Sequence, residues 1–441
     1  MSLCMTEQSV KQTDQFTIYD YDQRAVRTWK LIRTKVSETN TQYIEDYEMS
    51  MVTDNLAKAG RQKHLETLLS LSKILENSDL IREKNWKKLS KRDIDKIVKI
   101  INDTYKNPRG KETWSSHDHK KILKIFFRWL KLGNRKMKKV GDPPETRDIV
   151  VGSVESEIMR EELMDSDDDR KKLLNGCNGN LRNIALIDCC FDAGPRAGEI
   201  LNCKLKHITQ DKYGYKIEVD GKTGQRPIRI IKASPSLAKW LDAHPFKGQK
   251  DAAAWPKKSG ADKGTPLSYA AARQAIVRAN NEAAKKSPGF DKRVCFTLLR
   301  HAEITETSNF MTAAQMEDRH GWVIGSKQPR RYVHRSGVNV DKALFKQYGI
   351  KTDEDEEEPQ VPTICSICEM PNEPDSDTCS KCGKPLSIEA AIAAEEKETV
   401  ANQKLVDTLE EMKRKQANEN ERLSHALEYL MRKEKERESK E

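Results

Sequence analysis

The sequence predicts a mainly α-helical protein with one small β-sheet, and three observations carry this prediction. Apolar residues recur every three to four positions over residues 26–140, the spacing of one helix face. Two short strand-like segments, residues 215–219 and 227–231, are joined by a turn that contains Asp-Gly, the sequence signal of a hairpin. Two Cys-x-x-Cys pairs near the C-terminus predict a small separate ribbon, and a long helix is expected after it.

Composition limits the classes of protein to consider. The 441 residues suffice for two or three domains, 34% of them are charged, and the net charge is +10. No apolar run approaches the roughly 18 residues of a membrane span, and the N-terminus lacks the basic-then-apolar pattern of a signal peptide. We therefore expect a soluble, cytoplasmic protein without a membrane partner. The positive charge favours a polyanionic partner, although a solvated surface explains it equally well.

The N-terminal part of the chain is predicted to be a bundle of four or five helices. Residues 1–25 are polar and aperiodic, so we expect a flexible arm there. Apolar groups such as Trp29, Ile32 and Val36 mark the helix faces over residues 26–140. Lysines and arginines are dense between these positions, as in K-N-W-K-K-L-S-K-R at residues 84–92. Two prolines and a glycine in residues 141–152 predict an interdomain linker.

A second domain is predicted over residues 153–350. Its apolar segment at residues 181–194 reads as a buried helix that ends at Gly194. The hairpin follows, and Lys222 lies near its tip, where a long amine can reach into a groove. The rest of this domain is expected to be mostly helical.

Short motifs follow one another through this second domain. They are G-P-R-A-G-E-I at residues 194–200, the Lys222 turn, T-L-L-R-H at 297–301, H-G-W at 320–322 and R-R-Y-V-H at 330–334. In this order they resemble the tyrosine recombinases, the phage-type integrase family, and in particular its archaeal branch. The resemblance implies that residues 26–140 form a core-binding domain that clamps DNA and that residues 153–350 form the catalytic domain.

The resemblance also implies a role for each motif residue. Arg196 and Arg300 would neutralise a DNA phosphate through forked, permanently charged guanidinium groups. Tyr332 would be the nucleophile that forms a 3′-phosphotyrosyl link, and Lys222 would protonate the 5′-oxygen that leaves. Trp322 takes the family's His/Trp position. Each residue also has an ordinary structural alternative: a salt bridge for the arginines, solvent exposure for the lysine, and packing for the tyrosine.

One position departs from the family pattern. Thr297 stands where the family usually has a histidine, and a threonine cannot act as a base near neutral pH. Either His301 or His320 acts as the base in its place, or the set of catalytic residues is partly degraded. His301 also reads as a packed neighbour without a catalytic role. The other catalytic residues are retained, which favours an active enzyme.

The resulting hypothesis is a site-specific recombinase from an archaeal mobile element. It would cut and rejoin double-stranded DNA attachment sites as a tetramer, through a Holliday junction, without ATP or a catalytic metal, in the cytoplasm at the nucleoid. One alternative is a catalytically impaired, DNA-binding regulatory homologue. Another is a type IB topoisomerase-like enzyme, which shares the tyrosine chemistry but acts as a monomer. The helical domain and linker before the motifs favour the recombinase.

The C-terminal region adds three segments. Residues 351–362 form an acidic spacer, and residues 363–387 hold the two cysteine pairs. Four thiolates at this spacing predict a structural zinc ribbon, with an iron–sulfur centre or dithiol redox chemistry as alternatives. The predicted ligands are Cys365, Cys368, Cys379 and Cys382.

Residues 388–441 are predicted to be a helical tail. Apolar residues fall at alternating spacings of four and three in two groups, around Leu409 and around Leu423, with Gln416 and Glu419 between them. This pattern fits a coiled coil or an isolated solvated helix. We expect the ribbon and the tail to bind DNA or a neighbouring protomer.

Overall fold

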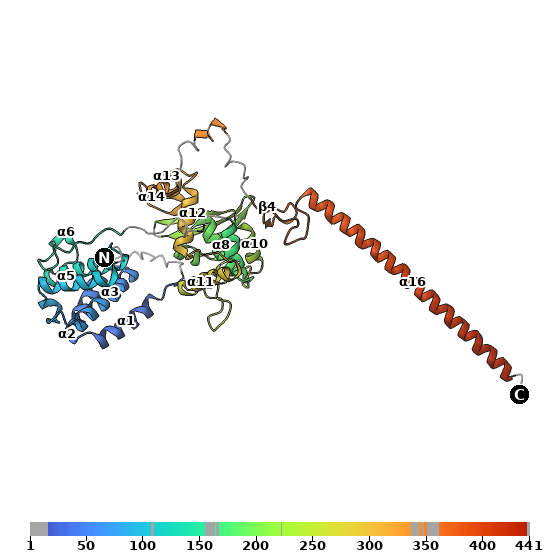
Figure 1. The fold of residues 1–441 in the computed structure, drawn as a ribbon, viewed down its shortest axis with the longest axis horizontal. Helices are drawn as coiled ribbons and strands as arrows, with labels where there is room; N and C mark the ends of the chain where they lie inside the picture. The colour runs from blue at the N-terminus through green and yellow to red at the C-terminus, as the bar shows by residue number, and fades with distance from the viewer. Residues whose placement is uncertain are drawn as a thin grey trace, which may run out of the picture. The chain divides into compact units, whose positions relative to one another are not determined.

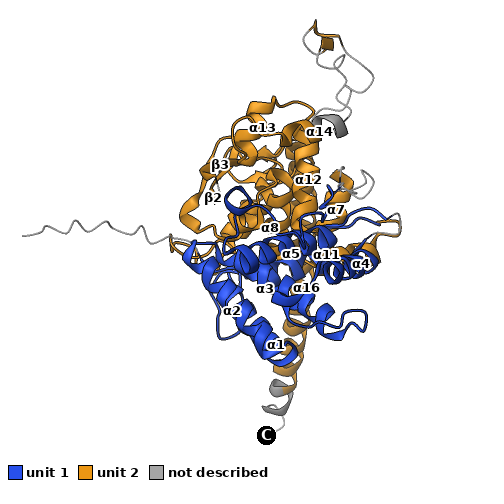
Figure 2. Cartoon of the chain, turned by 90° about the vertical axis from the view of Figure 1, so that its left-hand side faces the viewer, with its two compact units in different colours: residues 1–164, 256–277, 291–294 blue, residues 165–255, 278–290, 295–441 orange. Residues whose placement is uncertain are grey.

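The structure is a computed structural model that describes residues 16–106, 110–154, 164, 167–221, 223–336, 344–345, 348–350 and 361–438. The chain divides into two compact units (Figure 2). Unit 1 comprises residues 1–164, 256–277 and 291–294, and unit 2 comprises residues 165–255, 278–290 and 295–441. Helices dominate both units, beside one three-stranded and one two-stranded sheet among the described residues. The predicted fold class, mainly α with a small β-sheet, is confirmed.

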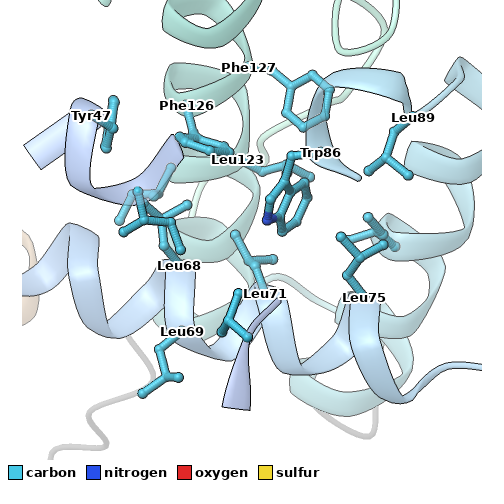
Figure 3. Packing of buried hydrophobic residues seen from close by; sticks show 14 of the residues in the cluster. Tyr47, Leu68, Leu69, Leu71, Leu75, Trp86, Leu89, Leu123, Phe126 and Phe127 are labelled. Carbon is cyan, nitrogen blue, oxygen red and sulfur yellow. The ribbon is translucent and has the colours of Figure 1, made fainter. Parts of the chain in front are cut away.

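Unit 1 is built around a helical bundle. Its helices are α1 (Tyr21–Lys35), α2 (Glu38–Thr53), α3 (Lys58–Asn77), α4 (Lys91–Tyr105), α5 (Trp114–Leu132) and the short α6 (Met137–Val140), with a 3-10 turn at Trp86–Lys88. Helix α1 begins inside the predicted arm, of which residues 1–15 lie outside the described residues. The Trp86 indole is fully buried and packs edge-on against Phe126 and Phe127 (Figure 3). Burial of such aromatic and leucine side chains stabilises the bundle.

The segment 141–152 lies along α5. Asp142 accepts hydrogen bonds from Arg128 and forms an ion pair with Lys124 at 3.1 Å. Glu145 pairs with Lys131 at 2.6 Å, and Ile149 joins the apolar core. The segment is therefore held against the bundle, while its role as an interdomain linker stays a prediction.

Unit 2 is organised around the buried helix α8 (Leu181–Ala193), against which α10 (Ser234–Asp242) and α12 (Phe296–Thr307) pack. The other helices that contribute to unit 2 are α7 (Asp167–Asn175), α9 (Ala197–Leu201), α11 (Tyr269–Lys286, shared with unit 1), α13 (Ala313–His320) and α14 (Gln328–Ser336), with a 3-10 turn at Leu205–His207. The predicted hairpin forms strands β2 (Gly214–Gly221) and β3 (Gly224–Ile230), and β1 (Ile208–Asp211) pairs antiparallel with β2.

The C-terminal part begins with a two-stranded sheet, β4 (Thr363–Ile364) and β5 (Pro371–Asn372), and ends in the long helix α16 (Ile388–Glu438) (Figure 1). The ribbon contacts the rest of unit 2: β5 packs on α10, and Gln210 donates to the carbonyl of Glu369 at 2.8 Å. The predicted acidic spacer lies outside the described residues except for 361 and 362. Across the described part of the chain, no helix has the length and apolar character to span a membrane.

Candidate active site

The Arg196 guanidinium is positioned by two glycines and a glutamate. Gly194 ends α8 with a φ of 54°, which lets the chain turn so that Arg196 becomes the N-cap of α9. The guanidinium donates to Glu199 Oε1 at 2.7 Å and to the carbonyl of Gly321 at 3.0 Å. The side chain keeps 36% of its surface exposed, so it is held in place and remains accessible.

Arg300, on α12, is fixed by two backbone carbonyls. Its Nη1 donates to Gly194 at 2.6 Å and its Nη2 to His320 at 2.7 Å. Burial, followed by the positive charge of Arg196, lowers the pKa of Arg300 to about 10. The group stays charged at neutral pH, but it lies in a region of excess positive charge, which favours a bound anion.

Tyr332, His301 and Trp322 form a stacked group beside these arginines. The Tyr332 side chain, on α14, is 5% exposed, and its hydroxyl hydrogen-bonds to Nδ1 of His301 at 2.5 Å. The Trp322 ring stacks 6.0 Å from the Tyr332 ring, and the Arg300 guanidinium lies 5.9 Å from the Trp322 ring centroid. When His301 carries its proton on Nε2, its Nδ1 accepts a hydrogen bond from the Tyr332 hydroxyl.

Arg226 is a site residue that the sequence analysis missed. It projects from β3 and donates two hydrogen bonds to Glu199, at 3.0 and 2.8 Å, and a third to the carbonyl of Arg319 at 3.0 Å. Burial would raise the pKa of Glu199, but the hydrogen bonds and charges of Arg226 and Arg196 outweigh it and lower that pKa. One carboxylate therefore holds both arginines.

A signal for Arg226 exists in the strand pattern. Alternate residues of β3 face inward, and Arg226 shares the buried face with Ile228 and Ile230. A charged residue at an inward position requires a buried partner.

Lys222 lies outside the described residues, so its predicted role as the proton donor stays a prediction. Its two neighbours, however, are fixed against the site. A Cβ at Gly221 would lie 2.4 Å from Glu199 Oε1, so any other residue there would displace this carboxylate. Thr223 donates to the carbonyl of Gly321 at 3.1 Å, the same carbonyl that accepts from Arg196. Gly221 and Thr223 are thus held close to Glu199 and to the carbonyl that accepts from Arg196.

Thr297 is exposed on the first turn of α12. It precedes Arg300 and His301 by three and four residues, the spacing of neighbours on one helix face. A histidine at this position would therefore share that face with Arg300.

His320 is fully buried and its ring faces inward. Its Nε2 lies 3.3 Å from the Thr307 hydroxyl, and its Nδ1 lies 3.4 Å from Glu303 Oε2. Burial, then the surrounding arginines, lowers the pKa of His320 to about 2, whereas burial raises the pKa of Glu303 to about 7. Glu303 also accepts from Arg319 at 2.7 Å. The lowered pKa keeps His320 uncharged at neutral pH, and the Tyr332 hydroxyl hydrogen-bonds to His301. The role of His320 as an alternative base stays a prediction.

The four C-terminal cysteines form a cluster whose sulfur atoms all lie within 4.8 Å of one another. Cys365 and Cys382 are 3.7 Å apart, and Cys368 and Cys379 are 3.5 Å apart. A tetrahedral site with metal–sulfur bonds of about 2.3 Å has sulfur–sulfur edges of roughly 3.8 Å. These thiols can bind a metal ion.

Comparison with known proteins gives similarity to solved structures only. No family model and no curated protein matches the chain. A lambda integrase tetramer bound to a Holliday junction is 13% identical with a TM-score of 0.49, over 68% of this chain and 79% of that one. The XerH site-specific recombinase bound to difH is 14% identical with a TM-score of 0.45, over 75% of this chain and 99% of that one. The Tn1549 transposon integrase is 14% identical with a TM-score of 0.47, over 67% of this chain and 95% of that one. At these values the likeness says nothing about activity, which depends on the contacts described above.

Proposed function

We propose that this protein is a site-specific DNA recombinase of the tyrosine-recombinase type. One observation carries the proposal: a tyrosine hydroxyl, an imidazole and two guanidinium groups from three separate segments converge in unit 2. Tyr332 comes from α14, His301 and Arg300 from α12, and Arg196 from the start of α9. An activated phenol beside two cations suits nucleophilic attack on a phosphodiester.

The two arginines would bind the scissile phosphate. They are anchored by Glu199 and by the carbonyls of Gly194, His320 and Gly321, so they need little rearrangement when charge develops on the phosphate. Burial, and then the charge of Arg196, lowers the pKa of Arg300, and a phosphate bound between the two arginines would offset both effects.

In the cleavage step, the Tyr332 oxygen attacks phosphorus and its proton passes to His301. The bond from phosphorus to the 5′-oxygen breaks, and we assign Lys222 as the group that protonates this oxygen. The phosphotyrosyl link conserves the bond energy, so a 5′-hydroxyl from a second strand reverses the step without ATP. In this scheme His301 replaces the histidine that is absent at Thr297. Since Tyr332 is 5% exposed, its hydroxyl must move outward to meet DNA.

The cysteine cluster would hold a structural zinc ion rather than a catalytic one. Its four thiols suit zinc, which would supply folding energy to the ribbon. We further propose that the protein acts as a tetramer on paired double-stranded DNA sites in the cytoplasm, and that it comes from an archaeal mobile element.

A covalent-trapping assay tests the function. Duplexes that bind the purified protein are selected from DNA flanking its gene, nicked to trap the intermediate, and incubated without added divalent ion. A protein–DNA adduct on a denaturing gel is expected for the wild type and for Tyr348→Phe, since Tyr348 is an exposed residue past the motif. Tyr332→Phe should give none.

The same assay separates the alternatives. Tight binding without an adduct would favour the regulatory homologue, for which the missing histidine at Thr297 is the supporting observation. An adduct together with relaxation of supercoiled plasmid by the monomer, without strand exchange between two sites, would favour the topoisomerase-like enzyme.

A further inference from the structure

Helix α16 carries an exposed apolar seam. Apart from Ala390, every residue from 388 to 433 is exposed. Eight of the apolar residues form two clusters at heptad spacing, separated by Gln416 and Glu419 on the same face. The first cluster is Leu405, Val406, Leu409 and Met412, and the second cluster is Leu423, Ala426, Leu427 and Leu430. Exposed fractions run from 47% for Val406 to 63% for Leu430. A helix with such a stripe usually buries it against a partner.

We propose that two copies of the chain pair through α16 in antiparallel orientation over residues 402–433. In this alignment the first cluster of one copy lies against the second cluster of the other. Leu405 then faces Leu430, Leu409 faces Ala426, and Met412 faces Leu423, each contact occurring twice by two-fold symmetry. The face is self-complementary, so a second copy of this chain is the occupant that it fits.

The polar residues decide the orientation. In a parallel, in-register pair, Glu419 would face Glu419 of the other copy inside the seam, and two like charges there are costly. In the antiparallel pair, Glu419 faces Gln416, whose amide can donate a hydrogen bond to the carboxylate.

The flanking positions agree in part with this orientation. Val406 meets Leu427 of the other copy in the antiparallel pair, which extends the apolar contact. Lys415 and Arg422 approach each other at the opposite edge. Lys415, however, already pairs with Glu411 of its own helix at 2.8 Å, and both groups are exposed to water. The apolar contacts outweigh this edge repulsion.

The pairing would act as a long spacer. The centre of the overlap falls between residues 417 and 418, so the two residues at position 388 would lie roughly 90 Å apart, at about 1.5 Å per residue. The two ribbons would then lie at opposite ends of the paired helices. Such a bridge joins two copies at a distance, and it does not rest on the proposed catalytic function.

Disulfide trapping in the full chain tests the pairing and its direction. Leu405→Cys and Leu430→Cys are purified separately with tags of different size, mixed, and oxidised with oxidised glutathione. The proposal expects a mixed disulfide dimer and no cross-link in either variant alone. The matched control, Leu405→Cys mixed with Ala417→Cys, places the second thiol outside the seam and should stay at the wild-type background.

Each other outcome overturns the proposal. Self-cross-linking of the single variants would mean parallel pairing. The mixed variants could cross-link no more than the wild type, and the wild type could have the mass of a monomer in light scattering. These two results together would mean that α16 does not pair with a second copy. If the proposal holds, the double variant Leu409→Asp/Leu423→Asp should have half the mass of the wild type.

Discussion

The interiors of the two units are stabilised in different ways. In unit 1, Trp86 and Phe126 lie in an apolar cluster where shape and area dominate (Figure 3). In unit 2, the region around the arginines buries Glu199, Arg226 and Glu303, and each of these charged groups needs a specific partner. Unit 1 also buries ion pairs, such as Arg128–Asp142, but the Glu199 carboxylate of unit 2 additionally holds the accessible Arg196 side chain. Because a buried ion pair is itself weak evidence for stability, we assign the unit 2 network to positioning the arginines.

An isosteric change at Glu199 should show this contrast most strongly. Glu199→Gln keeps the volume but leaves Arg226 buried without its carboxylate, so the free energy of unfolding of unit 2 should fall by about 3–5 kcal/mol. In unit 1, the volume-conserving change Leu71→Met should cost less than about 1.5 kcal/mol. Urea titration of both variants measures the two losses. Equal losses would mean that the charge network has no special role.

A second prediction concerns the base. His301→Gln should lower the rate of adduct formation by about 10²-fold or more, the usual contribution of a positioned base. Adding Thr297→His to that variant should recover part of the rate, because it places an imidazole on the same face of α12. Single-turnover cleavage of nicked DNA gives both rates. An unchanged rate in His301→Gln would mean that His301 is only a packed neighbour.

The Glu303–His320 pair predicts a pH effect on stability. Because the pKa of Glu303 is raised, its contribution to stability is lost as pH rises from about 4.5 through about 7. Because the pKa of His320 is lowered, its contribution to stability is lost as pH falls below about 6.5. The two trends oppose each other between pH 4.5 and 6.5. Glu303→Gln leaves the histidine trend alone, so this variant should lose about 2 kcal/mol more than the wild type between pH 7 and pH 5. Parallel stability curves for the two proteins would mean that burial does not raise the pKa of Glu303.

Two glycines offer a finer comparison. Gly321 and Gly325 have similar φ angles, 61° and 75°, but a Cβ at Gly321 would lie 2.5 Å from Arg226 Nη1, whereas at Gly325 no atom lies within 4 Å. Gly321→Ala should therefore destabilise by about 1 kcal/mol more than Gly325→Ala. It should also slow adduct formation, because Gly321 holds Arg196. Thermal unfolding of both variants isolates the contact with Arg226 from the shared backbone strain.

The sequence predicted the helices and the hairpin because their signals are local. Apolar spacing marked the faces of α3 and α5, and the Asp-Gly pair marked the turn between β2 and β3. The motifs also led to side chains that the structure brings together around Tyr332. The supporting residues escaped prediction, since the Arg226–Glu199 and Glu303–Arg319 contacts join segments that no local pattern relates. The different surroundings of His301 and His320 likewise follow from contacts that the sequence alone does not reveal.

Peptide mapping of the trapped adduct would show directly whether Tyr332 forms the covalent bond to DNA. The trapped adduct is digested with nuclease and trypsin, and mass spectrometry locates the residual nucleotide. We expect a phosphodiester-linked nucleotide on the peptide that contains Tyr332. A nucleotide on the Tyr348 peptide, or on any other residue, would contradict the assignment of the active site.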